Sequence, residues 1–364
     1  MTKKDQYYNI KREGVAKTAG SRVLGNSTRL FYLLTPESIM LHLDKLGINS
    51  TGRCLPLNAL ENRVYEIEVE GGQWGNFIVA KFYRPGRWTK DQLIEEHSFM
   101  RELEQEEIPV IAPLEIDGTS IFELNIHEQD YNENIYFSLY LKKGGRLDDD
   151  LSCERLRQLG YQLARLHQIG SKKTFTSRPV LNVQNYFEPG IENICEFEHL
   201  PAHLPSAFGS EAMKIAPLIS QALEKYPVTR LHGDFHHGNV LWRDSQALIV
   251  DFDDCSRGPV VQDMWMMIKG LGDDYQSNRE AFLEGYESYG IFDRKSLEII
   301  PHLSILRQIH YHGWVAKRWQ DPIFRDTFPQ YKEESFWQTI LHDLIRACME
   351  LEQLGNQSKY PEYF

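Results

Sequence analysis

The sequence has no long hydrophobic run and few cysteines. No stretch of the 364 residues approaches the roughly 18 to 20 consecutive apolar residues that a membrane-spanning helix needs. The lysines near the N-terminus are not followed by an apolar segment, so no secretory signal is indicated. The five cysteines are odd in number and no two are spaced as Cys-x-x-Cys, which favours reduced thiols over a disulfide framework. We therefore expect a cytoplasmic protein without a membrane partner.

Positive charge is scarce relative to negative charge. Lysine and arginine number 40 against 52 aspartates and glutamates, which gives a formal net charge of −12. Non-specific binding to nucleic acid depends on dense basic side chains, so we expect no nucleic-acid partner. The remaining composition, 41% hydrophobic and 25% charged residues, is that of an ordinary globular protein long enough for about two domains. We expect a monomer.

The first third of the chain is rich in strand patterns, and the remainder is mostly helical. Strands are predicted where apolar residues alternate or cluster, and helices where they recur every three or four positions. The predicted strands cover 64–69, 77–83, 120–127 and 135–141, within a sheet of about five strands, and the predicted helices cover 36–46, 89–107, 152–169, 211–225, 260–270, 277–289, 294–319 and 333–354. We predict an α+β fold of two lobes with a cleft between them.

The two predicted lobes meet at a glycine-containing segment. Lys142-Lys143-Gly144-Gly145 ends the strand patterns, so we interpret residues 142–146 as a hinge. The predicted organisation is an N-terminal extension (1–28), a β-rich N-lobe (29–141), the hinge, a helical C-lobe (147–354) and a tail (355–364). The pattern within the extension leaves its conformation open.

Residues 230–254 concentrate polar side chains around two short apolar runs. The runs 240–242 and 247–250 flank a polar turn, which predicts a β-hairpin. Because ionisable groups cluster before the first strand and after the second, the hairpin brings them close together. Burying so many charges without partners would be costly. We therefore interpret this segment as a functional site.

Three residues of this segment have the spacing of a phosphotransferase catalytic loop. Asp234 and Asn239 fit the pattern Asp-x-x-x-x-Asn, in which the aspartate orients or deprotonates the attacking hydroxyl and the asparagine offers a neutral oxygen to Mg²⁺. Asp251, at the end of the next short strand, supplies the anionic oxygen that this cation prefers.

Two other interpretations of the segment are open. Aspartate and asparagine are frequent in turns, so the same three residues could simply cap the hairpin. His232, Asp234, His236 and His237 could instead be zinc ligands of a hydrolase. A zinc site would leave the asparagine and the later aspartate without a role, whereas Mg²⁺ prefers such oxygen donors. The magnesium interpretation accounts for more of the segment.

A single lysine, Lys81, lies within the apolar strand at 77–83. In a buried position it needs an anionic partner. The sequence Val-Ala-Lys at this point is similar to the strand lysine of kinases, which holds nucleotide phosphates and pairs with a glutamate on the following helix. That helix offers Glu95 and Glu96, and its apolar positions favour Glu96. The alternative is a lysine that reaches solvent at the edge of the sheet.

Together these motifs resemble one enzyme family. The segment His-Gly-Asp-Phe-His-His-Gly-Asn (232–239), followed by Val-Asp-Phe-Asp-Asp (250–254), is similar to the aminoglycoside phosphotransferase and choline kinase family, a branch of the protein-kinase-like fold. Further segments resemble a bacterial group of stress-response protein kinases within that family: 62–65, 79–88, 95–97, 258–265 and 318–322. The resemblance covers roughly residues 30–350 and implies a bilobal kinase fold.

The resemblance also implies ATP and Mg²⁺ as cofactors and a role for each site residue. Asp234 would be the catalytic base, Asn239 and Asp251 the magnesium ligands, and Asp263 a brace for the catalytic loop. The implied nucleotide-side residues are Lys81, Glu96, Asn62, Arg63, Tyr140 and Leu141, and the secondary candidates are Asp253 and His236.

Two departures from the kinase pattern limit these implications. The segment 57–63 has no Gly-x-Gly-x-x-Gly, so we expect side chains within 58–63, Asn62 and Arg63 among them, to contact phosphates there. The predicted metal-binding segment, residues 251–253 (the metal segment), reads Asp-Phe-Asp. Gly258-Pro259 follows it too soon for a long activation loop. We therefore expect no regulation by phosphorylation of such a loop.

The expected reaction is transfer of the ATP γ-phosphoryl group to a hydroxyl. The resemblance favours serine and threonine hydroxyls of proteins, including those of the chain itself, in a bacterial stress response. The runner-up is a kinase for a small molecule, such as an aminoglycoside, choline or a homoserine-like alcohol. A third hypothesis, a nucleotide-binding scaffold without catalysis, is disfavoured by the intact set of Lys81, Asp234, Asn239 and Asp251.

Overall fold

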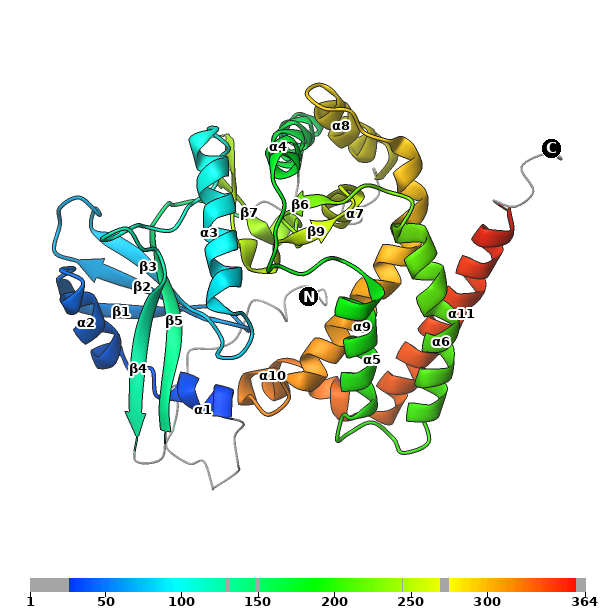
Figure 1. Cartoon of the computed structure of the whole chain (residues 1–364), viewed down its shortest axis with the longest axis horizontal. Helices are drawn as coiled ribbons and strands as arrows, with labels where there is room; N and C mark the ends of the chain where they lie inside the picture. Colours follow the sequence, from blue (N-terminus) through cyan, green and yellow to red (C-terminus); the bar gives the residue numbers. More distant parts are fainter. Residues whose placement is uncertain (1–25, 129–130, 148–150, 244, 269–274, 358–364) are drawn as a thin grey trace.

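The chain folds into a sheet-containing N-lobe and a larger helical C-lobe (Figure 1). The computed structural model describes residues 26–128, 131–147, 151–243, 245–268 and 275–357. The N-lobe sheet is antiparallel, with the strand order β1-β2-β3-β5-β4. Its strands and flanking helices are β1 (Ser50–Leu57), β2 (Arg63–Val69), β3 (Phe77–Phe82), β4 (Phe122–Glu128), β5 (Tyr131–Leu141), α1 (Asn26–Tyr32), α2 (Pro36–Lys45) and α3 (Lys90–Gln105). The predicted fold class is confirmed.

Helices cover both faces of this sheet. Ile39 of α2 and Phe82 of β3 belong to one buried cluster on the first face. Because side chains alternate along a strand, Lys81 is on the opposite face of β3. On that face Leu93 of α3 packs with Tyr83, directly after β3. The alternation therefore directs the one lysine of the strand toward α3 and away from the apolar core.

The C-lobe is built around a helical core. Its helices are α4 (Cys153–Lys172), α5 (Glu188–Cys195), α6 (Pro205–Leu223), α7 (Val261–Ile268), α8 (Tyr275–Glu287), α9 (Ile300–Lys317), α10 (Pro322–Thr327) and α11 (Glu334–Gln357). Trp319, Tyr331 and Trp337 are buried in the largest apolar cluster. Two small sheets pair β6 (Thr229–Leu231) with β9 (Ser256–Gly258) and β7 (Val240–Arg243) with β8 (Gln246–Ile249). The predicted hairpin is the β7–β8 pair.

The structure contains the predicted strands and helices and adds others. The predicted helix 294–319 is divided into a 3-10 helix (Arg294–Ile299) and α9, and residues 269–270 of the predicted helix 260–270 lie outside the described residues. β1 is not among the predicted strands, because most of its side chains are exposed and its sequence has no clear apolar pattern. Backbone pairing with β2 holds it in the sheet. α5 has Pro189 and Gly190 in its first turn, residues typical of a loop. Gly190 is needed because a Cβ there would lie 2.8 Å from the carbonyl oxygen of Ile309 in α9. α1 begins within the predicted extension, whose residues 1–25 lie outside the described residues.

Candidate active site

A cavity of about 830 Å³ lies between the two lobes. The N-lobe contributes Lys81, and the segment Tyr140–Lys143 lines the cavity where β5 ends. The C-lobe contributes its lining from the segment around the β7–β8 hairpin and from α9, including Asp234, Asn239, Asp251 and Arg307. Predicted site residues that are far apart in the sequence therefore line the same cavity.

The turn before Asp234 is held by Asp263 of α7. The carboxylate of Asp263 accepts hydrogen bonds from the backbone N–H groups of His232 and Gly233, each at 2.8 Å. Gly233 has a φ of +86°, and a Cβ there would lie 2.0 Å from the carbonyl oxygen of Asp254. Only glycine fits both conditions. These contacts agree with the predicted bracing role of Asp263.

Asp234 lies between two proton-bearing side chains. Nη2 of Arg307 donates to its Oδ1 at 2.5 Å, and Nε2 of His236 lies 3.3 Å from its Oδ2. Because Nδ1 of His236 accepts the N–H of Gly238 at 2.9 Å, the ring proton is on Nε2, facing the carboxylate. Burial alone would raise the pKa of Asp234, but His236 and Arg307 outweigh it and hold the pKa below its usual range. Asp234 is therefore ionised at neutral pH and able to accept a hydrogen bond from a hydroxyl.

Asn239 and Asp251 present oxygen atoms to the cavity. Nδ2 of Asn239 donates to the backbone oxygen of Asp234 at 2.9 Å, which leaves Oδ1 for a cation. Asp251 has φ 63° and ψ 70°, an uncommon left-handed conformation for a residue other than glycine, and its side chain is 54% exposed. One neutral and one anionic oxygen donor fit Mg²⁺, which takes water and phosphate oxygens for its remaining positions.

The geometry does not support the zinc interpretation. Across the part of the chain that the structure describes, no three histidine, cysteine, aspartate or glutamate side chains are placed to hold a metal ion together. His232 is fully buried, with its Nε2 atom 2.9 Å from the backbone oxygen of Val250. His237 contacts the backbone oxygen of Met267 through its Nε2 atom at 3.2 Å. Both rings therefore support the loop.

Lys81 of the N-lobe forms ion pairs with carboxylates of the C-lobe. Its Nζ lies 3.0 Å from Oδ1 of Asp253 and 3.2 Å from Oδ1 of Asp251. Glu96, the predicted partner, lies farther away at 4.0 Å, and its other oxygen is bound by Arg178. Burial alone would lower the pKa of Lys81, but the three carboxylates raise the pKa well above its usual value. Arg178 also donates to the backbone oxygen of Asp253 at 2.8 Å, which joins α3 to the metal segment.

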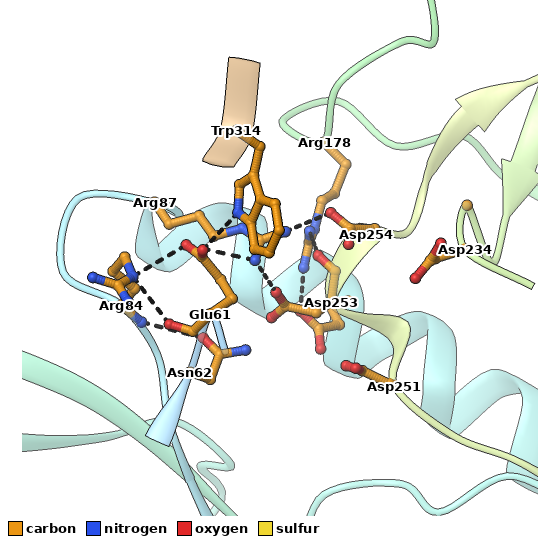
Figure 2. Close-up of polar contacts among 12 residues, drawn as sticks. Glu61, Asn62, Arg84, Arg87, Arg178, Asp234, Asp251, Asp253, Asp254 and Trp314 are labelled. Atoms are coloured by element: carbon orange, nitrogen blue, oxygen red, sulfur yellow. Dashed lines mark hydrogen bonds and ion pairs between the residues drawn. The ribbon is translucent and has the colours of Figure 1, made fainter. Parts of the chain in front are cut away.

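The loop between β1 and β2 is tied to the C-lobe through Glu61. This carboxylate accepts a hydrogen bond from Arg318 at 2.6 Å. It also accepts one from the indole N–H of Trp314 at 2.7 Å (Figure 2). Burial alone would raise the pKa of Glu61, but Arg87, Arg318 and Arg84 outweigh it and lower the pKa to about 2. An ionised glutamate therefore stands where the Gly-rich loop of a kinase would lie.

Asn62, the last residue of the loop, and Arg63, the first residue of β2, have different surroundings. Asn62 is buried at the cavity wall, and its Oδ1 accepts the backbone N–H of Arg84 at 3.2 Å. Arg63 does not line the cavity, and its guanidinium pairs with Asp321 at 3.2 Å. Asp321 is fully buried and also accepts hydrogen bonds from Arg84 at 2.9 Å and Tyr32 at 3.4 Å. The structure thus brings Asn62, but not Arg63, to the predicted nucleotide side.

The site also contains residues that local sequence patterns did not single out. They are Glu61, Arg87, Arg178 and Arg307. Arg87 pairs with Asp253 at 2.7 Å and with Asp254 at 2.5 Å (Figure 2). Each of these side chains is paired with a residue that is distant in the sequence, so spacing carried no signal for it.

Comparison with known proteins assigns the chain to a family. The model of the phosphotransferase enzyme family matches residues 54–300. Stress response kinase A of Escherichia coli K12 is 36% identical over 315 residues, which cover 86% of this chain and 92% of that protein. Serine/threonine protein kinase RdoA of Salmonella typhimurium is 36% identical over 314 residues, which cover 85% of this chain and 90% of that protein. The chain belongs to the phosphotransferase enzyme family and is an ATP-dependent phosphotransferase homologous to these kinases.

Solved structures share the fold at low sequence identity. An amicoumacin kinase in complex with AMP-PNP and Ca²⁺ matches with a TM-score of 0.66 at 18% identity, over 84% of this chain and 96% of that chain. A spectinomycin phosphotransferase matches with a TM-score of 0.58 at 16% identity, over 88% of this chain and 99% of that chain. These likenesses define the kinase-like fold alone. Within the described ranges, none of the helices has the length and apolar character needed to cross a bilayer.

Proposed function

We propose that this chain is a serine/threonine protein kinase that uses ATP and Mg²⁺ and acts in a bacterial stress response. The observation that carries the proposal is the meeting of Lys81 from the N-lobe with Asp251 from the C-lobe, 3.2 Å apart, in the cavity that also contains Asp234. One cavity thereby combines a cation suited to phosphate, oxygen atoms suited to a metal ion and a carboxylate suited to orienting a hydroxyl. The names of the two bacterial relatives support a protein acceptor.

Asp234 would receive the acceptor hydroxyl. The hydroxyl oxygen forms a bond to the γ-phosphorus while the bond to the β–γ bridging oxygen breaks and ADP leaves. The hydroxyl proton passes to the carboxylate of Asp234. Because such transfers proceed through a loose transition state, orientation and charge stabilisation contribute most of the acceleration. The lowered pKa of Asp234 suits a group that orients the hydroxyl first and accepts its proton late.

The remaining residues would hold the nucleotide. Asn239 and Asp251 would bind Mg²⁺, which when bound neutralises charge on the β- and γ-phosphates. Lys81 would contact the phosphates from the N-lobe side. Tyr140 and Leu141, which line the cavity near the hinge, would border the base.

Phosphorylation with radiolabelled ATP tests the proposal. In the presence of Mg²⁺ and a general protein acceptor, we expect label on the acceptor and on the chain itself. Asp234→Asn should lower transfer at least about 10²-fold, the range for losing a general base, while nucleotide binding persists. Asp343→Asn, a change in a surface pair of α11, serves as the matched control.

Two results would overturn the proposal in different ways. Label that appears only on small alcohols would show a small-molecule kinase. Magnesium-dependent binding of ATP without transfer to any acceptor would show a scaffold without catalysis.

A further inference from the structure

The acceptor side of the cavity contains a cation, Arg307, to which the proposed chemistry assigns no contact with a substrate. Arg307 lies on α9, lines the cavity, and has a side chain that is 35% exposed. Its Nη2 atom donates to Asp234. A guanidinium carries five N–H donors in a rigid planar fork, so most of the donors of Arg307 remain for a ligand that occupies the cavity beside Asp234.

The acidic side chains that line the cavity are already paired. Each of those that the structure describes has a basic partner within 4.0 Å. The pairs are Glu61–Arg318, Glu66–Lys142, Glu96–Arg178, Asp234–Arg307, Asp251–Lys81, Asp253–Lys81 and Asp254–Arg87. A cationic acceptor would therefore have to share a carboxylate that already has a basic partner, and repulsion between the two cations would weaken its binding.

The wall next to Arg307 is aromatic and uncharged. His310, one turn further along α9, lies with its ring centroid 4.8 Å from that of Tyr186. Burial, with help from Arg87 and Arg307, lowers the pKa of His310 to about 4, so the ring is neutral at pH 7. Arg87 already forms ion pairs with Asp253 and Asp254. On this wall, Arg307 is therefore the cation placed to meet an anionic group on the acceptor.

We propose that Arg307 is a specificity-determining residue for the acceptor. While it stays hydrogen-bonded to Asp234, its guanidinium binds a carboxylate that flanks the phosphoacceptor hydroxyl. The preferred substrate is then a serine or threonine within an acidic segment of a protein, an inference that rests on the proposed kinase function. Arginine suits this role because its planar fork binds carboxylates through two parallel hydrogen bonds.

Three peptides that share a central serine and differ only in acidic, amide or basic flanks test the inference. For the wild type we expect kcat/KM for the acidic peptide to exceed that for the amide peptide about tenfold, mainly through KM, which corresponds to about 1.4 kcal/mol. Arg307→Gln should remove this preference, and Arg307→Glu should reverse it toward the basic peptide. Lys317→Gln, an exposed change on the same helix outside the cavity lining, should keep the wild-type ranking.

The ranking of the peptides separates recognition from general damage. A variant that only disturbs Asp234 lowers kcat for all three peptides alike, and titration with a fluorescent ATP analogue shows that the variant is folded. Equal kcat/KM values for the three peptides in the wild type, or an unchanged ranking in Arg307→Glu, would overturn the inference.

Failure of the underlying proposal gives a distinct result. If no peptide, general protein acceptor or residue of the chain itself is phosphorylated, the protein-kinase function is wrong, and glycolate and ethanolamine replace the peptides as acceptors. A preference for glycolate that Arg307→Glu reverses would still support the role of Arg307. No preference between these two alcohols would overturn it.

Discussion

Lys81 of the N-lobe lies 3.0 Å from Asp253 of the C-lobe, closer than the 4.0 Å that separates it from Glu96. The lysine–glutamate pair expected from kinases is therefore one part of a larger charge cluster, in which Arg178 holds the glutamate. Phosphates that enter the cavity would share the ammonium with the carboxylates of the metal segment. We therefore expect Lys81 to couple nucleotide binding to the position of that segment.

Removing the charge of Lys81 should weaken nucleotide binding. Lys81→Met keeps most of the length of the side chain but leaves Asp251 and Asp253 without their shared cation. We expect nucleotide affinity and single-turnover transfer to fall at least about tenfold, since a hydrogen bond to a charged group contributes roughly 1.5 to 3 kcal/mol. Lys90→Met, which removes an exposed pair with Glu123, should change neither quantity. Unaltered affinity in Lys81→Met would contradict the assignment.

Asp251 should determine the Mg²⁺ concentration that nucleotide binding requires. Asp251→Asn removes the anionic oxygen of the predicted pair, so the Mg²⁺ concentration for half-maximal nucleotide binding should rise at least about tenfold, the change typical of losing even an outer partner of a metal ligand. Chelation of Mg²⁺ should abolish phosphoryl transfer in the wild type. A magnesium titration monitored with a fluorescent nucleotide measures the first effect, and transfer of radiolabelled phosphate with and without a chelator measures the second. A titration curve that coincides with that of the wild type would exclude Asp251 as a ligand.

Arg178 should be important for stability as well as for the site. Arg178→Gln removes the nearer of the two cations beside the buried Glu96, and breaking a buried ion pair typically costs about 3 to 5 kcal/mol. Arg157→Gln, in an exposed pair with Glu284, should lower the free energy of unfolding by less than about 1 kcal/mol. Urea denaturation of the two variants provides the comparison. Adding Glu96→Gln to Arg178→Gln should recover part of the loss, and further destabilisation by the second change would argue against an ion pair.

Glu61 should make the free energy of unfolding depend on pH in the acidic range. Its pKa is lowered in the folded chain from 4.5 to about 2, so its contribution is fully present above pH 4.5 and is lost as the pH falls through this interval. At pH 7, Glu61→Gln should be less stable than the wild type by about 3 kcal/mol. The difference between the two proteins should shrink between pH 5 and pH 2, and unfolding measured across this range would reveal it. A difference that stays constant with pH would show that the glutamate charge is not the stabilising element.

The part of the site that sequence patterns predicted is local in the chain. Asp234, Asn239 and Asp251 come together because one short hairpin connects them, and a hairpin can be recognised from two apolar runs and a turn. Lys81 was recognisable because a lone charge interrupts an apolar strand. Its meeting with Asp251 depends on how the two lobes pack, which the pattern alone does not encode.

The parts that escaped prediction depend on long-range pairing. Arg178 meets Glu96 and Arg307 meets Asp234 only after separate elements have packed, and surface arginines with similar neighbours in the sequence are far more common than buried ones. Arg63 illustrates the reverse case. It has the right place in the chain to contact phosphates, yet the buried carboxylate of Asp321 binds its guanidinium. Spacing could not reveal that competitor.

The buried carboxylate of Asp321 has a consequence for the timing of the catalytic cycle. It belongs to the C-lobe but accepts hydrogen bonds from Arg63, Arg84 and Tyr32 of the N-lobe. Wide separation of the lobes would break these three hydrogen bonds at once, so we expect nucleotides to enter and leave through smaller movements. We therefore expect departure of ADP to be slower than phosphoryl transfer. Rapid-quench measurements should show a burst of product in the first turnover, followed by a slower steady rate.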